Sequence, residues 1–139
     1  MKIKVTRIDD GFHFVAENET GNTLSMDAGS ELGGSNTGMR PIELMPAALA
    51  GCSAFDIVSI LKKQRQHIKD FQVEVNAERQ TGKMANLITA FNIVYTLRGN
   101  IDKEKLEKAI ELSMKKYCSV AKMLEKTAKI TYSYVLYPK

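Results

Sequence analysis

The sequence has no tryptophan, and only two cysteines and two histidines occur among its 139 residues. His13 and His67 do not combine with Cys52 and Cys118 in a zinc-finger spacing, so we predict no metal site. The 20 basic and 16 acidic residues are interspersed along the chain and form no basic block. Because a nucleic-acid-binding surface would cluster its charges and add stacking aromatics, the sequence argues against a nucleic-acid partner.

The sequence also lacks the patterns of a signal peptide and of a membrane span. Met1–Asp10 alternates lysines with Ile3 and Val5 and has neither an apolar core nor a cleavage site. The most apolar stretch, Leu44–Leu61, contains proline, cysteine, serine and aspartate, which predicts a buried helix rather than a membrane helix. We therefore expect a cytoplasmic protein with no membrane partner, whose two cysteines are kept as thiols by a reducing environment.

The chain has enough hydrophobic residues, 44% of the total, to form the core of one compact domain spanning residues 1–139. Alternating patterns predict three short strands within Met1–Asp27, followed by a glycine-rich loop over Ala28–Arg40. A helix is predicted from Pro41 to about Gln66, with Pro46 kinking or delaying its first turns. The further predicted elements are strands at Phe71–Ala77 and Leu87–Leu97, helices at Asp102–Lys116 and Tyr117–Leu124, and a strand at Ile130–Tyr137. This order predicts an α+β fold in which a central buried helix packs on an antiparallel sheet.

The two cysteines lie 66 positions apart and have different surroundings. Cys52 lies in a run of small residues, Ala47–Ala54, and taken alone such a cysteine is more often a core residue than a nucleophile. Cys118 opens a short predicted helix, with Lys115 and Lys116 nearby. A thiol in the first turn of a helix feels a positive field that favours the thiolate.

Three segments carry a family resemblance: Pro41–Leu44, Ala47–Cys52 with the following Asp56, and Lys116–Val120. Together they resemble the osmotically inducible protein C / organic hydroperoxide resistance family, and more closely its OsmC-like branch. The predicted order of strands and helices is similar to that family's fold, so the resemblance covers nearly the whole chain.

The resemblance implies an intertwined homodimer with its active site at the subunit interface. It also implies that Cys52, as a thiolate, attacks the O–O bond of an organic hydroperoxide and becomes a sulfenic acid. Cys118 then condenses with it to a disulfide, which an external dithiol reduces, a lipoyl-type dithiol in the best-known members; no cofactor is implied. The chemistry is consistent, because a sulfenic acid needs a nearby thiol before further oxidation destroys it.

The sequence departs from the family pattern at the residues that activate the first cysteine. The family glutamate ten residues before that cysteine is replaced by Ile42, and Glu43 is its neighbour. The family's activating arginine comes from the N-terminal strands, where this chain has only Arg7. Arg40 is a candidate replacement, with Glu43 orienting its guanidinium through a bidentate pair. The alternative for Glu43 is a helix-capping or dipole role.

Asp56 follows Cys52 by about one helical turn and lies on roughly the same face. A carboxylate there would raise the pKa of the thiol unless a cation compensated its charge. The alternative, which we favour from the sequence, is that the helix simply becomes solvent-exposed beyond Ile57.

Two hypotheses of function follow from these residues. The first is a thiol-dependent peroxidase acting on organic hydroperoxides, with Cys52 and Cys118 as the reacting pair and Arg40 and Glu43 assisting. The second is a binding protein that holds a small apolar or thiol ligand at the dimer interface with little turnover. The retained cysteine pair favours the first hypothesis, whereas Ile42 and the missing strand arginine favour the second. A purely structural dimer would leave the two motif cysteines unexplained.

Overall fold

The computed structural model describes residues 1–138, which divide into two compact units on either side of the Met45–Pro46 boundary. The prediction that the chain forms a single domain stays a prediction. The elements follow one another in the predicted order of three strands, a long helix, two strands, two helices and a strand. This order confirms the predicted α+β fold.

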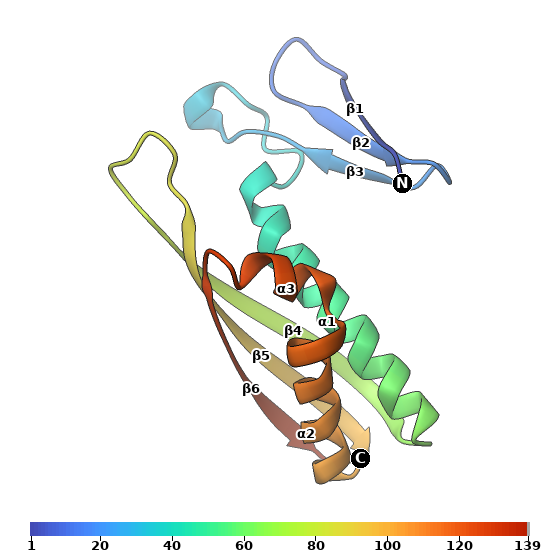
Figure 1. Ribbon diagram of the computed structural model, residues 1–139. Helices are drawn as coiled ribbons and strands as arrows, with labels where there is room; N and C mark the ends of the chain where they lie inside the picture. The colour runs from blue at the N-terminus through green and yellow to red at the C-terminus, as the bar shows by residue number, and fades with distance from the viewer. Residues whose placement is uncertain (139) are drawn as a thin grey trace. The chain divides into compact units, whose positions relative to one another are not determined.

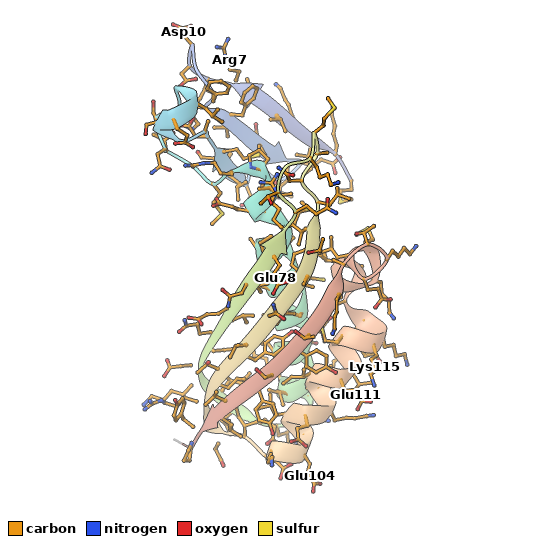
Figure 2. The ribbon with its side chains drawn as sticks, turned by 90° about the vertical axis from the view of Figure 1, so that its left-hand side faces the viewer. Arg7, Asp10, Glu78, Glu104, Glu111 and Lys115 are labelled. Carbon is orange, nitrogen blue, oxygen red and sulfur yellow. The ribbon has the colours of Figure 1, made fainter. Side chains whose placement is uncertain are left out.

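The N-terminal unit is built on an antiparallel sheet of three strands, β1 (Ile3–Arg7), β2 (Phe14–Asn18) and β3 (Thr23–Met26), in the order β1-β2-β3 (Figure 1). The predicted strands in this region are confirmed. Arg7, the only arginine of these strands, donates hydrogen bonds from its guanidinium to the backbone carbonyls of Asp10 and Gly11 (Figure 2). Its charge is therefore used to close the turn between β1 and β2.

The glycine-rich loop after β3 is organised around one carboxylate. Asp27 is buried, and its side chain accepts hydrogen bonds from the backbone N–H groups of Ala28, Ser35 and Thr37 and from the Thr37 hydroxyl. These donors, above all those of Thr37, lower the pKa of Asp27 to about 2. The loop also contains two short 3-10 turns, η1 (Ser30–Leu32) and η2 (Pro41–Glu43). It is thus more ordered than its composition predicted.

The C-terminal unit contains a long helix, a three-stranded sheet and two shorter helices. Its elements are α1 (Leu44–Lys63), which begins at the boundary between the units, β4 (His67–Arg79), β5 (Ile88–Asn100), α2 (Lys103–Leu112), a π-helical turn η3 (Ser113–Tyr117), α3 (Ser119–Leu124) and β6 (Lys129–Tyr137). The helices lie on one face of the sheet (Figure 1). Apolar side chains of β5 alternate between buried and partly buried positions, as expected for a central strand covered on one face.

The sheet of the C-terminal unit is mixed, with strand order β4-β5-β6. β4 and β5 form the predicted antiparallel hairpin, but β5 and β6 pair in parallel. The prediction of an antiparallel sheet is therefore wrong for its last strand. The physical reason is the connection between β5 and β6, which carries α2 and α3 across one face of the sheet and so brings β6 back to the starting end of β5.

Helix α1 begins at Leu44, directly after the 3-10 turn at Pro41–Glu43, so that Pro46 falls in its first turn. Backbone N–H groups in the first turn of a helix have no intrahelical acceptor, so the N–H that Pro46 lacks is not needed there. The predicted delay of the regular helix is confirmed. Leu49, Ser53, Ile57 and Leu61 are buried at four-residue spacing. The opposite face is exposed to solvent, where Phe55 is 78% exposed. Within the chain alone, the predicted central helix is buried on one face only.

By length and composition, residues 41–63 also have the character of a membrane-spanning helix, with a mean hydropathy of 1.8 over their most apolar window. Core helices of soluble proteins share that character. Here the buried face of α1 packs in one hydrophobic cluster with β5 and α2. Charged residues cover the outer side of α2 and η3, where Glu104 and Glu111 of α2 and Lys115 of η3 are labelled in Figure 2. The contacts are those of an amphipathic helix layer on a sheet.

Candidate functional site

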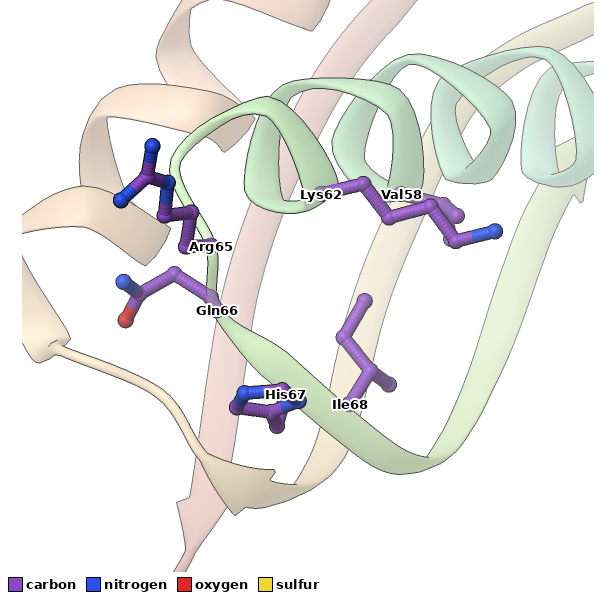
Figure 3. A pocket seen from close by; sticks show the side chains of 6 residues that line it. All are labelled: Val58, Lys62, Arg65, Gln66, His67 and Ile68. Carbon is purple, nitrogen blue, oxygen red and sulfur yellow. The ribbon is translucent and has the colours of Figure 1, made fainter.

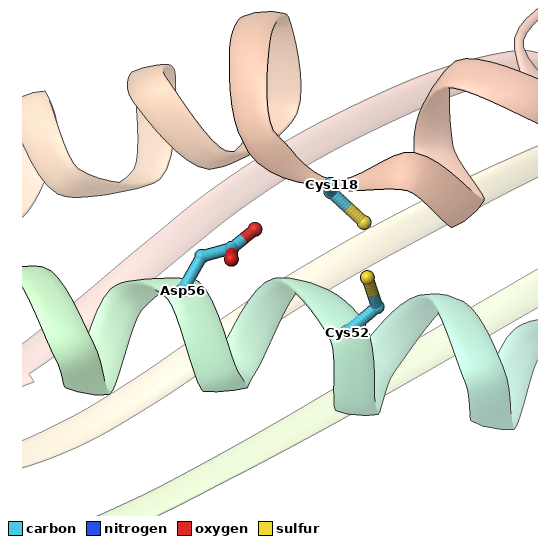
Figure 4. Close-up of side chains that lie close together, drawn as sticks. All are labelled: Cys52, Asp56 and Cys118. Atoms are coloured by element: carbon cyan, nitrogen blue, oxygen red, sulfur yellow. The ribbon is translucent and has the colours of Figure 1, made fainter.

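The two cysteines meet between α1 and the start of α3, beside a carboxylate (Figure 4). The Sγ atoms of Cys52 and Cys118 and a carboxylate oxygen of Asp56 all lie within 4.8 Å of one another. Both thiols are free. Cys52 and Asp56 come from successive turns of α1, because residues four apart share a helix face. The structure thus brings the two sequence-predicted cysteines together in one site.

Cys118 is positioned by the π-helical turn η3, which follows α2. Its backbone N–H donates to the carbonyl of Ser113 at 2.8 Å, which closes the wider turn, and Cys118 then adopts an extended conformation as the N-cap of α3. The Sγ atom accepts a hydrogen bond from the N–H of Ala121 at 3.3 Å. Single π turns inside helices are frequent at functional sites. The predicted placement of this thiol at a helix N-terminus is confirmed.

The predicted effect of that placement on the thiolate is wrong. Cys118 is fully buried, and burial raises the pKa of its thiol to about 11, with smaller contributions from Cys52 and Asp56. The N–H of Ala121 acts in the opposite direction but is outweighed. The two lysines expected to help lie elsewhere, since Lys115 pairs with Glu111 at 3.4 Å and Lys116 lies over the ring of Tyr117. Cys52 is only half-buried, so it is the more accessible of the two thiols.

Asp56 belongs to the site, contrary to the favoured sequence interpretation. Its carboxylate is half-buried and accepts a hydrogen bond from the hydroxyl of Ser113 at 2.9 Å. The helix does not become fully exposed beyond Ile57 either, because Leu61 is also buried. Within residues 1–138 no cation forms an ion pair with Asp56. Ser113 was missed from the sequence because nothing local in its surroundings indicates a partner on α1.

The core also contains the buried phenol of Tyr95, on β5. Burial raises the pKa of its phenol to about 12, so the hydroxyl stays neutral at physiological pH. In the part of the chain that the structure describes, this hydroxyl has no hydrogen-bond partner. Tyr95 lies within the predicted strand Leu87–Leu97, but the sequence pattern gave no sign that its hydroxyl would be buried without a partner.

Arg40 and Glu43 belong to the N-terminal unit, where their own contacts are defined. The Glu43 carboxylate accepts a hydrogen bond from the backbone N–H of Arg40 at 2.8 Å, which confirms the alternative of a capping role. The guanidinium of Arg40 donates to the side-chain oxygen of Asn36 at 2.9 Å and to the carbonyl of Gly38 at 3.1 Å. The expected bidentate pair between Arg40 and Glu43 is therefore wrong. The roles of both residues toward Cys52 stay predictions.

A separate open pocket lies where α1 ends and β4 begins (Figure 3), with a volume of about 680 Å³. It is lined by Val58, Lys62, Arg65, Gln66, His67 and Ile68. Lys62 is ten residues beyond Cys52 on α1, a distance of roughly 15 Å along a helix. The pocket holds neither cysteine and is distinct from the thiol site.

Known proteins share this fold, and their similarity extends over most of the chain. The model of the OsmC-like protein family matches residues 34–133. Protein YhfA of Escherichia coli (strain K12) is 38% identical over 126 residues, which is 90% of each chain. A hypothetical protein from Aquifex aeolicus has a TM-score of 0.85 at 25% identity, over 99% of this chain and 96% of that one.

A structure described as an organic hydroperoxide resistance protein OsmC, from Legionella pneumophila, has a TM-score of 0.65 at 13% identity over 96% of each chain, which shows a shared fold. The family match covers the segment that contains both cysteines and Asp56. With the YhfA relationship extending over most of the chain, the protein belongs to the OsmC-like family.

Proposed function

We propose that the protein is a thiol-dependent peroxidase that reduces organic hydroperoxides through Cys52 and Cys118. The observation that carries the proposal is the close approach of the two sulfurs, within 4.8 Å, in a chain whose fold is shared with an organic hydroperoxide resistance protein. A peroxidatic thiol needs a resolving thiol close by, because its sulfenic acid is otherwise oxidised irreversibly.

The burial of the two thiols supports the assignment of their roles. Half-buried Cys52 is the one that a peroxide reaches, whereas Cys118 is fully buried. In the first step the Cys52 thiolate attacks one peroxide oxygen, the O–O bond breaks, and the alcohol leaves after taking a proton. In the second step the Cys118 sulfur attacks the Cys52 sulfenic acid, the S–O bond breaks, and water leaves as the disulfide forms. An external dithiol, of the lipoyl type in our proposal, then restores both thiols.

The proposal extends to the assembly and location of the protein. Phe55 and Met45 are exposed on α1, which places apolar surface on the helix that carries Cys52. We propose that a second copy of the chain covers this face in a homodimer, located in the cytoplasm. The expected substrate is an organic hydroperoxide, and no cofactor is needed.

The competing function is a binding protein with little peroxidase activity, and one observation favours it. Asp56 lies beside both thiols with no cation paired to it within residues 1–138, and a lone carboxylate disfavours the thiolate. The same site would then hold a small apolar or thiol ligand. Oxidation by a peroxide distinguishes the two functions, because only the peroxidase couples the thiols to O–O bond cleavage.

One equivalent of cumene hydroperoxide per reduced chain is expected to consume both thiols and to yield one intramolecular Cys52–Cys118 disulfide with one equivalent of the alcohol. Thiol titration and peptide mass mapping measure these products. Cumyl alcohol, which lacks the O–O bond, is the matched control and should leave the thiols unchanged. If the thiols persist after exposure to the hydroperoxide, the peroxidase hypothesis is excluded and the binding-protein hypothesis remains.

Arg40→Ala is expected to lower the rate of Cys52 oxidation at least tenfold, about 1.4 kcal/mol of transition-state stabilisation. The reason is that a thiol beside a carboxylate needs a cation, and we propose that Arg40 supplies it. Asn36→Ala is the matched control, because it removes a partner of the guanidinium and retains the charge. Stopped-flow measurement of the oxidation gives both rates. Equal rates for wild type and Arg40→Ala would remove Arg40 from the site.

A further inference from the structure

The ligand atoms of the thiol site have the composition and spacing of a metal centre. Two cysteine sulfurs and one carboxylate oxygen lie within 4.8 Å of one another. Tetrahedral zinc, with bonds of about 2.3 Å to sulfur and about 2.0 Å to oxygen, needs its ligand atoms roughly 3.5–3.8 Å apart. Movement of about 1 Å, within the range of side-chain adjustment, would therefore close the three atoms around one ion.

Two of these three ligands are already held by neutral hydrogen-bond donors. The Ser113 hydroxyl donates to one carboxylate oxygen of Asp56 at 2.9 Å, and the N–H of Ala121 donates to Cys118 Sγ at 3.3 Å. Metal ligands in proteins are commonly oriented by such outer hydrogen bonds, which fix their direction without neutralising their charge. The π turn η3 brings both the Ser113 donor and Cys118 to the site.

The charge of the site is also unbalanced in the way that a divalent cation would correct. With both thiols ionised, the two sulfurs and Asp56 would carry three negative charges. Within residues 1–138 no lysine, arginine or histidine forms an ion pair with Asp56. Thiolates are soft ligands, and a mixed sulfur and carboxylate set suits zinc better than calcium or magnesium.

We infer that Cys52, Asp56 and Cys118 bind one zinc ion in the reduced protein, with the fourth position open to water. Cys118 is fully buried, whereas Cys52 and Asp56 are half-buried, so the ion would be reached from the side of α1. The sequence-based expectation of no metal site considered only histidine-containing patterns. It considered Asp56 only for its effect on the pKa of the Cys52 thiol and not as a metal ligand.

This inference rests in part on the proposed function, because the two thiols serve both. Zinc and the disulfide exclude each other, since each uses the same two sulfurs. Oxidation of the loaded site by an organic hydroperoxide consumes two protons, forms the S–S bond, breaks the O–O bond, and releases alcohol, water and Zn²⁺. The two electrons pass from the sulfurs to the peroxide, and the charge of zinc is unchanged.

Cobalt(II) is the probe for the test, because its tetrahedral thiolate complexes absorb strongly. Reduced, chelator-treated protein titrated with Co²⁺ without oxygen is expected to show a sulfur-to-cobalt charge-transfer band that saturates at one ion per chain. Zn²⁺ should bleach this band by displacement. Cys118→Ser should lose the band, and Asp56→Asn, which keeps the side-chain shape, should weaken Zn²⁺ binding at least tenfold. Asp70→Asn, a change of an exposed aspartate on β4, is the matched control and should bind as wild type does.

Circular dichroism of the variants checks that each is folded. A wild-type cobalt spectrum without the charge-transfer band would overturn the inference. Zn²⁺ binding that is as strong in Cys118→Ser and Asp56→Asn as in the wild type would also overturn it, because the binding would then be adventitious. Failure of the proposed function looks different. A saturating cobalt band in a protein whose thiols resist cumene hydroperoxide would support the metal site and exclude the peroxidase. Disulfide formation by the peroxide in a protein that gives no cobalt band would support the peroxidase and exclude the metal site.

Discussion

Replacing Cys52 by serine is expected to abolish peroxide reduction, with a loss of at least about a thousandfold in rate, or about 4 kcal/mol. Serine has no accessible anionic form at neutral pH, and the thiolate is the nucleophile in this chemistry. Cys118→Ser should fail differently: the first oxidation proceeds, and the sulfenic acid of Cys52 persists because no resolving sulfur remains. Loss of cumene hydroperoxide with excess dithiol, and mass analysis of dimedone-trapped protein, measure the two effects.

Ser59→Ala, at an exposed position of α1, is the matched control for both variants and should react as wild type does. The assigned roles are reversed if dimedone labels Cys118 in the Cys52→Ser protein while Cys52 in the Cys118→Ser protein stays a thiol. That outcome would require a peroxide to reach the fully buried sulfur first.

The second large effect is on stability, because the Cys52–Cys118 disulfide closes a loop spanning 66 positions. The chain-entropy relation gives about 4 kcal/mol of stabilisation for a loop of this size. The sulfurs already lie within 4.8 Å, so only a modest adjustment is needed to form the bond. The oxidised protein should therefore melt on the order of 10 °C above the reduced protein.

Calorimetry of the oxidised and reduced forms with a chelator present measures this difference free of any contribution from bound metal. Cys118→Ser is the control, and its melting temperature should be independent of redox state. An oxidised protein that melts at or below the reduced one would mean that strain in the closed site cancels the entropic gain.

Much of this fold was predictable because its elements have strong local patterns. Alternating apolar residues identified β4 and β5, although both are longer than predicted. Pro41 begins the 3-10 turn that leads into α1, and the delay of the regular helix predicted from Pro46 is correct, because proline is compatible with the first turn of a helix and incompatible with its interior. The meeting of Cys52 and Cys118 followed only from the family resemblance, since no local pattern relates positions so far apart.

The parts that were wrong depend on contacts between distant segments. The residues of β6 favour a strand in either direction, and only the two-helix connection before it indicates parallel pairing. Asp56 was correctly placed on the face of Cys52, but its partner Ser113 is 57 positions away. The pKa of Cys118 was misjudged because the helix N-terminus is visible in the sequence, whereas full burial appears only when α1 and β5 pack around it.

The parallel pairing of β5 with β6 also sets the order in which the molecule can fold. The β4–β5 hairpin joins neighbouring segments and closes early, whereas β6 can pair only after the whole connection bearing α2, η3 and α3 has docked. Cys118 lies inside that connection, so its sulfur reaches Cys52 in the same late step. We therefore expect a nascent chain to carry two separated thiols, and the reactive pair to form only when this connection has docked.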